Sequence, residues 1–344
     1  MGTLRKQTVL RVIIVLLVIA CFVLGLLAIR RFVTIRAAEE ALERETDPSL
    51  IDPYEDDDGV ARVFYNGSWY MANPDVESVL LLGIDSYGEQ EDNGRLVNNT
   101  QADFLMLFVV DNARKEYTAL QLNRDTMTLI PMVDTNGEYS GTVVEQLALA
   151  HIIGSGREDS CKYTAMAVSW LLSGVPIDHY VSLSMDAIGI MNDQVGGVTV
   201  TIPADMTSYD ESWTEGAAVK LTADQAETFV RKRKDVSDQT NLSRMERQRI
   251  FLSAWRELAL NKARSSGSFA LDAVLSIADY MVSDMTANEL SDFANSLTAY
   301  QDQGILTTEG ENRLGDTYYE FYVDEDALQQ TVMDLFYEKD TEMQ

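Results

Sequence analysis

The sequence concentrates basic residues in one short window. Between Arg231 and Arg249, seven side chains are basic and three are acidic. The basic residues are Arg231, Lys232, Arg233, Lys234, Arg244, Arg247 and Arg249. Arginine predominates, and its planar guanidinium can donate paired hydrogen bonds to a phosphate. Two hypotheses fit the window: a solvated helix–loop–helix whose bases pair with nearby acids, and a phosphate site.

The second half of this window has the pattern of a helix start. Ser243-x-x-Glu246 is a capping box that predicts a helix from there to about Ala263. Arg244, Arg247 and Gln248, spaced i, i+3 and i+4, then share one face. A basic residue in a first turn opposes the helix dipole, whereas the backbone N–H groups there attract anions. The placement of Arg244 therefore suggests a role beyond helix stability, and both hypotheses stay open.

Acidic side chains mark the ends of two predicted strands. Asp85 follows the apolar run 78–84, and Asp103 opens the next run. If these strands are neighbours, two carboxylates meet at one sheet edge and could bind Mg²⁺, which prefers oxygen ligands; ordinary turn carboxylates are the alternative. Asn123-Arg124-Asp125-Thr126 ends a third strand at what we expect to be the same edge. Arg124 would form an ion pair there or bind phosphate.

The elements that must position these residues alternate along the chain. Continuous apolar runs at 78–85, 103–111 and 116–122 predict strands buried on both faces. Further predicted helices are 163–172, 185–195, 222–230 (from the Thr222-x-x-Gln225 capping box), 287–301 and 325–336; further predicted strands are 180–184, 198–202 and a pair at 305–308 and 318–323. This interleaving predicts one α/β domain with a layered sheet.

Composition excludes several functional classes. The 344 residues carry a net charge of −28, although residues 1–36 hold six basic residues and no acid. The rest of the chain is thus more acidic still, which excludes a nucleic-acid-binding domain because such a domain must neutralise phosphates. Two cysteines by themselves cannot build a zinc site or a disulfide framework, and two histidines are too few for most metal or catalytic-triad chemistry. We expect His151, His179 and Cys161 to be structural.

The N-terminal segment predicts a membrane anchor. Val12–Ile29 is an unbroken apolar run with basic residues on both sides, long enough to span the hydrocarbon core. A cleaved signal peptide and a lipoprotein cleaved at Cys21 are the alternatives. We predict a cytoplasmic tail (1–11), an uncleaved signal-anchor helix (12–29) and an acidic juxtamembrane stalk (30–76), with the bulk of the protein outside the cell membrane.

Seven short motifs, in order, resemble the LytR–CpsA–Psr family of Gram-positive bacteria. They are LLLGID (80–85), the Asp103 strand, NRDT (123–126), GVPIDHYVSLSM (174–185), QVGGVTVTIP (194–203), LTADQAETFVRKR (221–233) and NLSRMERQ (241–248). The resemblance implies a three-layer α/β/α sandwich around a mixed central sheet, with an apolar groove for a polyprenyl tail. It places the catalytic domain at 77–338, followed by a short tail (339–344).

The resemblance also implies a function. Members move a glycopolymer, such as teichoic acid or capsule, from a polyprenyl-pyrophosphate carrier to peptidoglycan, with Mg²⁺. The protein then needs no nucleophile of its own, because a sugar hydroxyl attacks. Carried over by motif, Asp85 and Asp103 match the metal-binding acids, and Asp103 or Asp125 would be the general base, with Arg124 also catalytic. The pyrophosphate-binding set is Arg124, Arg231, Arg233, Arg244 and Gln248.

Three positions depart from the family pattern. Gln101 stands where the family usually has arginine, Asn123 replaces a usual proline, and Asn241 stands where aspartate is common. A direct arginine–phosphate hydrogen bond contributes about 1.5–3 kcal/mol, so loss of one could weaken substrate binding. A non-catalytic protein that binds polyprenyl pyrophosphate or cell wall is therefore an alternative, and a regulator of envelope gene expression is a third hypothesis.

Overall fold

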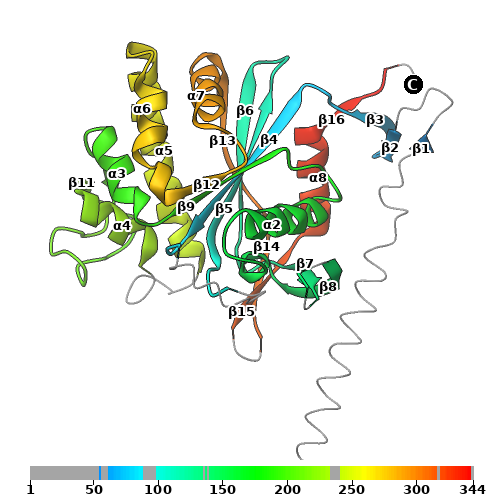
Figure 1. Ribbon diagram of the computed structural model, residues 1–344, viewed down its shortest axis with the longest axis horizontal. Coiled ribbons are helices and arrows are strands. Elements are labelled where there is room, and N and C mark those ends of the chain that lie inside the picture. The colour runs from blue at the N-terminus through cyan, green and yellow to red at the C-terminus, as the bar shows by residue number, and fades with distance from the viewer. Residues whose placement is uncertain are drawn as a thin grey trace, which may run out of the picture. The chain divides into compact units, whose positions relative to one another are not determined.

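The computed structural model describes residues 54–55, 61–87, 98–134, 136–137, 139–232, 241–315 and 318–341 (Figure 1). The chain divides into two compact units, Met1–Trp69 and Tyr70–Gln344. In the first, β1 (Tyr54–Glu55) pairs antiparallel with β2 (Ala61–Tyr65). None of the helices in the described ranges is long and apolar enough to cross a membrane. The predicted anchor at 12–29 lies outside those ranges.

The second unit is built around a mixed six-stranded sheet in the order β12-β9-β4-β5-β6-β13. The strands are β4 (Val76–Ile84), β5 (Ala102–Asp111), β6 (Glu116–Leu122), β9 (His179–Ser184), β12 (Met281–Ser283) and β13 (Gln301–Thr307). The pairs β4–β9 and β6–β13 are parallel, and the other three pairs are antiparallel. The predicted strands at 78–85, 103–111 and 116–122 are therefore adjacent, as the site hypothesis requires.

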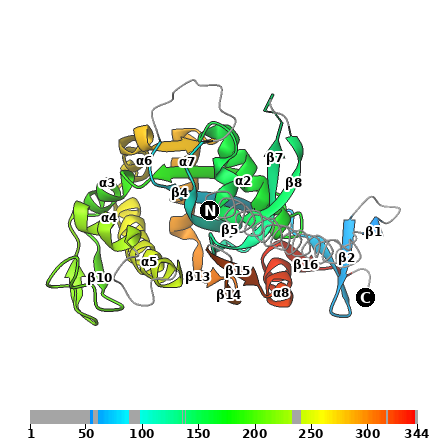
Figure 2. The ribbon, with the colours of Figure 1, turned by 90° about the horizontal axis from the view of Figure 1, so that it is seen from below.

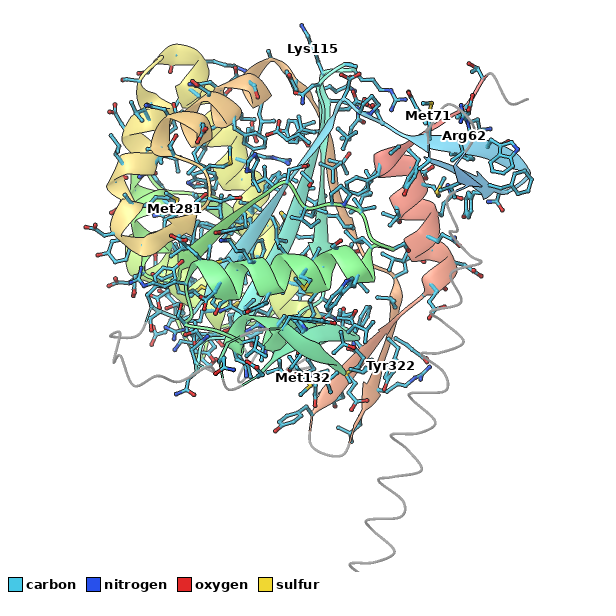
Figure 3. The ribbon with its side chains drawn as sticks, turned by 45° about the vertical axis from the view of Figure 1, so that its right-hand side comes forward. Arg62, Met71, Lys115, Met132, Met281 and Tyr322 are labelled. Carbon is cyan, nitrogen blue, oxygen red and sulfur yellow. The ribbon has the colours of Figure 1, made fainter. Side chains whose placement is uncertain are left out.

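Smaller strand pairs surround the central sheet. They are β7 (Met127–Val133) with β8 (Tyr139–Gln146), β10 (Thr199–Thr201) with β11 (Ala218–Lys220), β14 (Gly310–Leu314) with β15 (Tyr319–Val323), and β16 (Tyr337–Lys339) with residues 70–72 of β3 (Ser68–Ala72). Figure 3 shows Met132 on β7 and Tyr322 on β15 at one end of the sheet, with Lys115 in the β5–β6 turn at the other. Residues 70–72, expected in the stalk, thus belong to the larger folded unit.

Helices cover both faces of the sheet. They are α2 (Glu158–Leu171), α3 (Ala187–Gln194), α4 (Ala223–Arg231), α5 (Asn241–Ser265), α6 (Phe269–Ser276), α7 (Ala287–Ser296) and α8 (Glu325–Phe336), with 3₁₀ turns at Leu147–Ile152, Ala278–Tyr280 and Leu297–Ala299. One hydrophobic core packs α2 and α8 against the buried residues of β4, β5 and β6. Separate hydrophobic clusters include residues of α3, α4, α5, α6 and α7, which cover the other face. Figures 1 and 2 show the two groups of helices on either side. The α/β class and the mixed sheet are confirmed.

Two local predictions were wrong. β13 pairs with the edge of the central sheet and β15 with β14, so 305–308 and 318–323 do not pair with each other. Most side chains of β13 are exposed, so its sequence lacks the continuous apolar pattern that predicts a buried strand. Ser243 does not cap α5, because that helix already begins at Asn241. The Thr222–Gln225 capping box does open α4, with both reciprocal hydrogen bonds formed.

Candidate active site

The strand ends converge where the sequence predicted. β4 and β6 end, and β5 begins, at one edge of the sheet. Gly83 pairs with Phe104 and Ile84 with Ala102, so Asp103 is the extra residue of a β-bulge. Bulges redirect a side chain out of the regular alternation. Gly83 is required opposite it, because a Cβ there would lie 2.9 Å from the Cβ of Phe104.

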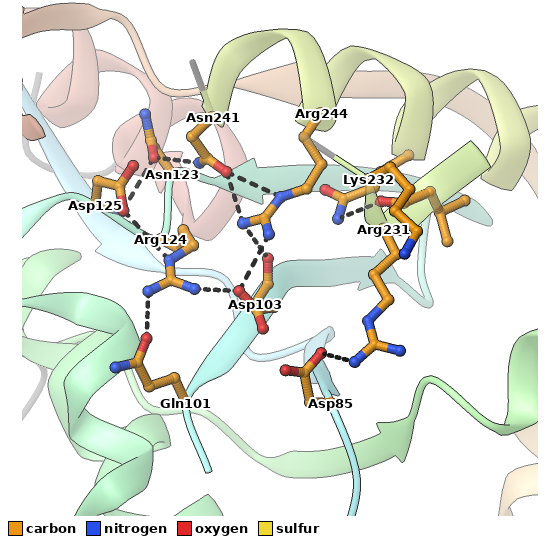
Figure 4. Close-up of polar contacts among 12 residues, drawn as sticks. Asp85, Gln101, Asp103, Asn123, Arg124, Asp125, Arg231, Lys232, Asn241 and Arg244 are labelled. Carbon is orange, nitrogen blue, oxygen red and sulfur yellow. Dashed lines mark hydrogen bonds and ion pairs between the residues drawn. The ribbon is translucent and has the colours of Figure 1, made fainter. Parts of the chain in front are cut away.

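Two arginines converge on the Asp103 carboxylate (Figure 4). Arg124 Nη1 donates to Asp103 Oδ1, and Arg244 Nη1 donates to the same oxygen at 3.1 Å. The side chains are 14% exposed for Asp103, 8% for Arg124 and 4% for Arg244. Guanidinium groups this deeply buried need a partner, since an isolated buried charge is costly. Asp103 is a partner of both arginines.

Arg124 is held by three residues. Its Nε donates to Asp125 Oδ1 at 3.2 Å, and its Nη2 donates to Gln101 Oε1 at 2.5 Å, in addition to the contact with Asp103. The sequence suggested that Gln101, in place of an arginine, removes a ligand contact. In the structure Gln101 instead fixes the orientation of Arg124.

Asn241 contacts Arg244, and Asn123 in turn contacts Asn241. Arg244 donates to Asn241 Oδ1 from Nε (3.2 Å) and Nη2 (2.7 Å). The Asn241 amide then donates from Nδ2 to Asn123 Oδ1 at 2.7 Å. Sequence reasoning treated both asparagines only as departures from a pattern and missed that they contact each other. No spacing signal could reveal this, because the two positions lie 118 residues apart.

Asp85 and Arg231 form a separate, more exposed pair. Arg231 Nη2 lies 3.0 Å from Asp85 Oδ1, and its Nη1 lies 2.8 Å from Glu227. Burial opposes the charge on Arg231, but the hydrogen bond to Glu227 and the attraction of Asp85 raise its pKa above the ordinary value. Arg231 ends α4, so its side chain reaches across to the end of β4. Arg233 lies outside the described residues.

Arg247 contacts backbone oxygens and not the aspartates of the site. It is buried, and it donates to the backbone oxygens of Phe229 (2.8 Å), Ser243 (3.1 Å) and Lys232. Burial lowers its pKa. The side chain therefore joins the end of α4 to the start of α5. The basic window combines a structural arginine with the site arginines, and the sequence did not distinguish them.

An apolar groove begins beside the arginine cluster. A first cavity of about 60 Å³ is lined by Gly83, Phe104, Val230, Gln248 and Phe251, among others. A second cavity of about 210 Å³ continues along α5, with Trp255, Ala259 and Leu260 in its wall, and shares Met191 and Leu252 with the first. Helix α5 therefore supplies part of the wall of both cavities. Helix α2 lines neither of these two cavities and packs on the opposite face of the sheet.

Gln248 joins the polar cluster to this groove. It lines the first cavity, and its Oε1 accepts a hydrogen bond from Gln121 at 3.4 Å. Gln121 also accepts from Arg249 Nη1 at 2.9 Å. A ligand with an anionic head and an apolar tail could therefore bind with the head at the arginines and the tail in the groove.

The magnesium site predicted at Asp85 and Asp103 stays a prediction. Asp85 and Asp103 stand at the ends of neighbouring strands. Within the described ranges, no group of three acids, histidines or cysteines is placed to hold a metal. Mg²⁺ commonly binds one or two carboxylates and completes its shell with water and substrate phosphate. Asp85 and Asp103 are the residues that would hold it.

The remaining nucleophile candidates are structural. Cys161 is fully buried, and burial raises its pKa to about 12, so the thiol stays protonated. His151 is buried beside it, with Nδ1 2.8 Å from the Thr100 carbonyl oxygen. His179 lies 3.4 Å from Asp284 at the far end of the sheet from Asp103. These contacts leave the aspartates and arginines as the chemical groups of the site.

Comparison with known proteins gives consistent matches. The chain matches the model of the LytR_cpsA_psr family over residues 39–336. Biofilm regulatory protein A of Streptococcus mutans is 28% identical over 195 residues, which cover 55% of this chain and 45% of that protein. TagU of Enterococcus faecalis, named a polyisoprenyl-teichoic acid–peptidoglycan teichoic acid transferase, is 26% identical over 234 residues, covering 65% and 66%.

The fold also matches solved structures. A structure of TagT bound to LI-WTA superposes with a TM-score of 0.57 at 21% identity, covering 76% of this chain and 90% of that one. At that identity the match shows the fold. The chain spans about half the length of the first curated relatives it matches.

Proposed function

This chain belongs to the LytR_cpsA_psr family, and from that membership we propose that it transfers a glycopolymer from a polyprenyl-pyrophosphate carrier to peptidoglycan. The observation that carries the proposal is the cluster of Arg124, Arg231 and Arg244 at the mouth of an apolar groove. Such a site suits an amphiphile with an anionic head. The relatives named as teichoic acid transferases, and TagT bound to LI-WTA, support the same substrate class.

The arginines would neutralise the pyrophosphate. Arg124 and Arg244 already point at one place because both contact Asp103. Arg231 is more exposed and can leave Asp85 at low cost, since exposed ion pairs contribute about 0–1 kcal/mol. Gln248 would contact the head where it meets the groove. Preorganised cations of this kind stabilise the charge that develops during phosphoryl transfer.

The transfer needs no protein nucleophile. A sugar hydroxyl of peptidoglycan forms a bond to the phosphorus that carries the glycopolymer, and the bond from that phosphorus to the bridging oxygen breaks. Polyprenyl phosphate leaves, and Asp103 or Asp125 accepts the hydroxyl proton. Bound Mg²⁺, held by Asp85 and Asp103, would supply further charge stabilisation to the phosphate oxygens.

The location follows from the same proposal. The segment 12–29 anchors the chain in the cell membrane by one helix, and the folded unit lies on the extracytoplasmic side, where peptidoglycan is. Wall teichoic acid, capsule and related polymers are the candidate cargoes. Nucleic acid is not a partner, because the chain is strongly acidic apart from residues 1–36.

Binding of polyprenyl pyrophosphate to the full chain in detergent micelles tests this function. We expect tighter binding of the pyrophosphate than of the monophosphate, dependent on Mg²⁺ and weakened by Asp85→Asn. Arg244→Ala should abolish the preference. Arg313→Ala is the matched control, because in the described part of the chain Arg313 contacts Glu311 and Tyr322 on the β14–β15 hairpin. No preference in the parent protein would refute the proposal. Preference without transfer to peptidoglycan would support the alternative of a binding protein.

A further inference from the structure

A polar cavity, distinct from the two apolar cavities of the groove, lies beside the arginine cluster. It has a volume of about 370 Å³, and its lining shares no residue with that of the apolar groove. Its polar lining consists of Asn123, Ser243, Glu246, Arg249, Thr307 and Thr308. Leu242, Met245 and Phe321 supply apolar surface between these groups. None of the roles assigned above uses this cavity.

Two buried polar atoms at this cavity lack a partner in the described part of the chain. They are Asn123 Nδ2 and Thr308 Oγ1. Asn123 is only 1% exposed. Buried polar groups in native proteins are nearly always hydrogen-bonded, so an unsatisfied pair at one cavity calls for an explanation. A bound ligand would explain both atoms if it offered an acceptor to Asn123 Nδ2 and a hydrogen-bonding group to Thr308 Oγ1.

The orientation of the Asn123 amide is fixed by its neighbours. Arg244 donates twice to Asn241 Oδ1, which leaves Asn241 Nδ2 as the donor to Asn123 Oδ1. The backbone N–H of Asp125 also donates to Asn123 Oδ1 at 3.0 Å. Exchanging the oxygen and nitrogen of Asn123 would therefore place donors against donors. Figure 4 shows the Asn123 nitrogen directed away from these bonds.

The cavity and the groove lie on different faces of α5. Residues 242, 245, 246 and 249 line the polar cavity, and 248, 251 and 252 line the groove. At 3.6 residues per turn the centres of these two sets are about 120° apart around the helix axis. A ligand in the polar cavity therefore approaches the arginine cluster from a different side than a tail in the groove.

The charges of the lining favour a neutral ligand. Glu246 adds a negative charge, and the one cation, Arg249, is already bonded to Gln121 at 2.9 Å. Hydroxyl, amide and carboxylate groups interspersed with apolar side chains suit a sugar ring, whose hydroxyls alternate with C–H faces. A second pyrophosphate or phosphate group would lack a free cation in the described lining.

We propose that this polar cavity binds a sugar of the acceptor glycan and presents its hydroxyl to the phosphorus. The assignment rests on the proposed function. Asn123 Nδ2 donates to one sugar oxygen, and Thr308 Oγ1 bonds to a second. Asn123 is also linked through Asn241 to Arg244. It therefore fixes the position of the acceptor sugar relative to the arginines that bind the donor.

Binding of an N-acetylglucosamine tetramer to the full chain in detergent micelles tests the assignment. Thr308→Val removes the hydroxyl and keeps the shape, so we expect the Kd for the tetramer to rise about 3- to 10-fold. Thr307→Tyr should block the cavity and abolish binding; Thr307 is exposed, so the fold tolerates it. Thr201→Val, an exposed strand position on β10, is the matched control. In all three variants the Kd for polyprenyl pyrophosphate should stay within about twofold of the parent.

The two proposals fail in different ways. A parent protein that binds polyprenyl pyrophosphate but not the tetramer would overturn the acceptor assignment alone. So would Thr308→Val and Thr307→Tyr proteins that bind the tetramer as the parent does. Weaker binding of a glycan-bearing donor, with tetramer binding unchanged, would assign the cavity to the transferred polymer instead and overturn the proposal. Absence of any pyrophosphate preference in the parent would refute the proposed function itself.

Discussion

Arg244 contacts Asp103 at two points: Nη1 lies 3.1 Å from the carboxylate Oδ1, and Nη2 lies 3.2 Å from the backbone carbonyl oxygen. The second contact uses the carbonyl at the β-bulge. Because Arg124 also donates to Oδ1, two buried guanidinium groups share this carboxylate, and Asp125 is a further partner of Arg124. The site is thus a charge cluster that a bound anion can reorganise.

Asp103→Ala should destabilise the free protein and make its stability depend on anions. Removing one partner of a buried ion pair costs about 3–5 kcal/mol, so we expect the free energy of unfolding to fall by about that amount. Inorganic pyrophosphate should recover part of the loss. Thermal and urea unfolding with and without pyrophosphate measure both effects, with the exposed Asp279→Ala as control. An unchanged stability would show that the arginines have other compensation.

Arg231→Ala should affect binding far more than stability. Its ion pair with Asp85 joins side chains that are 41% and 57% exposed, so the free energy of unfolding should change by less than about 1 kcal/mol. Affinity for polyprenyl pyrophosphate should fall roughly 10- to 100-fold. Glu227→Gln removes the other partner of Arg231 and should leave affinity nearly intact. Equal losses in the two variants would count against direct contact by Arg231.

Gln101→Arg should lower the stability of the protein and raise its affinity for pyrophosphate. Gln101 Oε1 accepts from Arg124, and an arginine there would face a like charge without that hydrogen bond. We expect the free energy of unfolding to fall by about 1 kcal/mol and pyrophosphate affinity to rise about tenfold at low salt. Scanning calorimetry measures the change in stability, and titration calorimetry at two salt concentrations measures the pyrophosphate affinity. Unchanged affinity would mean that position 101 does not face the ligand.

Leu252→Trp should shorten the groove, because Leu252 lines both apolar cavities. Affinity for a long-chain polyprenyl pyrophosphate should fall about tenfold or more, whereas affinity for inorganic pyrophosphate should not change. Leu275→Trp, at an exposed position outside both cavities, is the control. Parallel losses for both ligands would show a general structural defect and not a shortened groove.

His151 should make stability depend on pH in a defined window. Burial lowers its pKa from 6.5, so the folded protein keeps the imidazole neutral while the unfolded chain protonates it first. Stability is therefore full above about pH 6.5 and falls as the pH drops below it, by at most about 1.4 kcal/mol per pH unit. Urea unfolding between pH 7.5 and 5.5 should show this slope, and His151→Gln should reduce it. An equal slope in the variant would place the titration elsewhere.

Much of the fold could be predicted locally. Apolar runs identified β4, β5 and β6, and α8 has the predicted bounds Glu325–Phe336. The strands predicted at 305–308 and 318–323 overlap β13 and β15, but their pairing with β6 and β14 was missed, because it depends on neighbours in space. The predicted anchor at 12–29 and Arg233 lie outside the described residues and stay predictions.

The sequence by itself determined which chemistry is present. Arginines in one acidic chain, aspartates at strand ends and the absence of a nucleophile motif are properties of composition and short spacing. Only the tertiary structure decided which arginines share a carboxylate, that Arg247 holds backbone, and that Gln101, Asn123 and Asn241 are partners in the site. These contacts join residues far apart in the chain. They depend on strand order, the bulge at Asp103 and the packing of α5, and no local pattern encodes such long-range geometry.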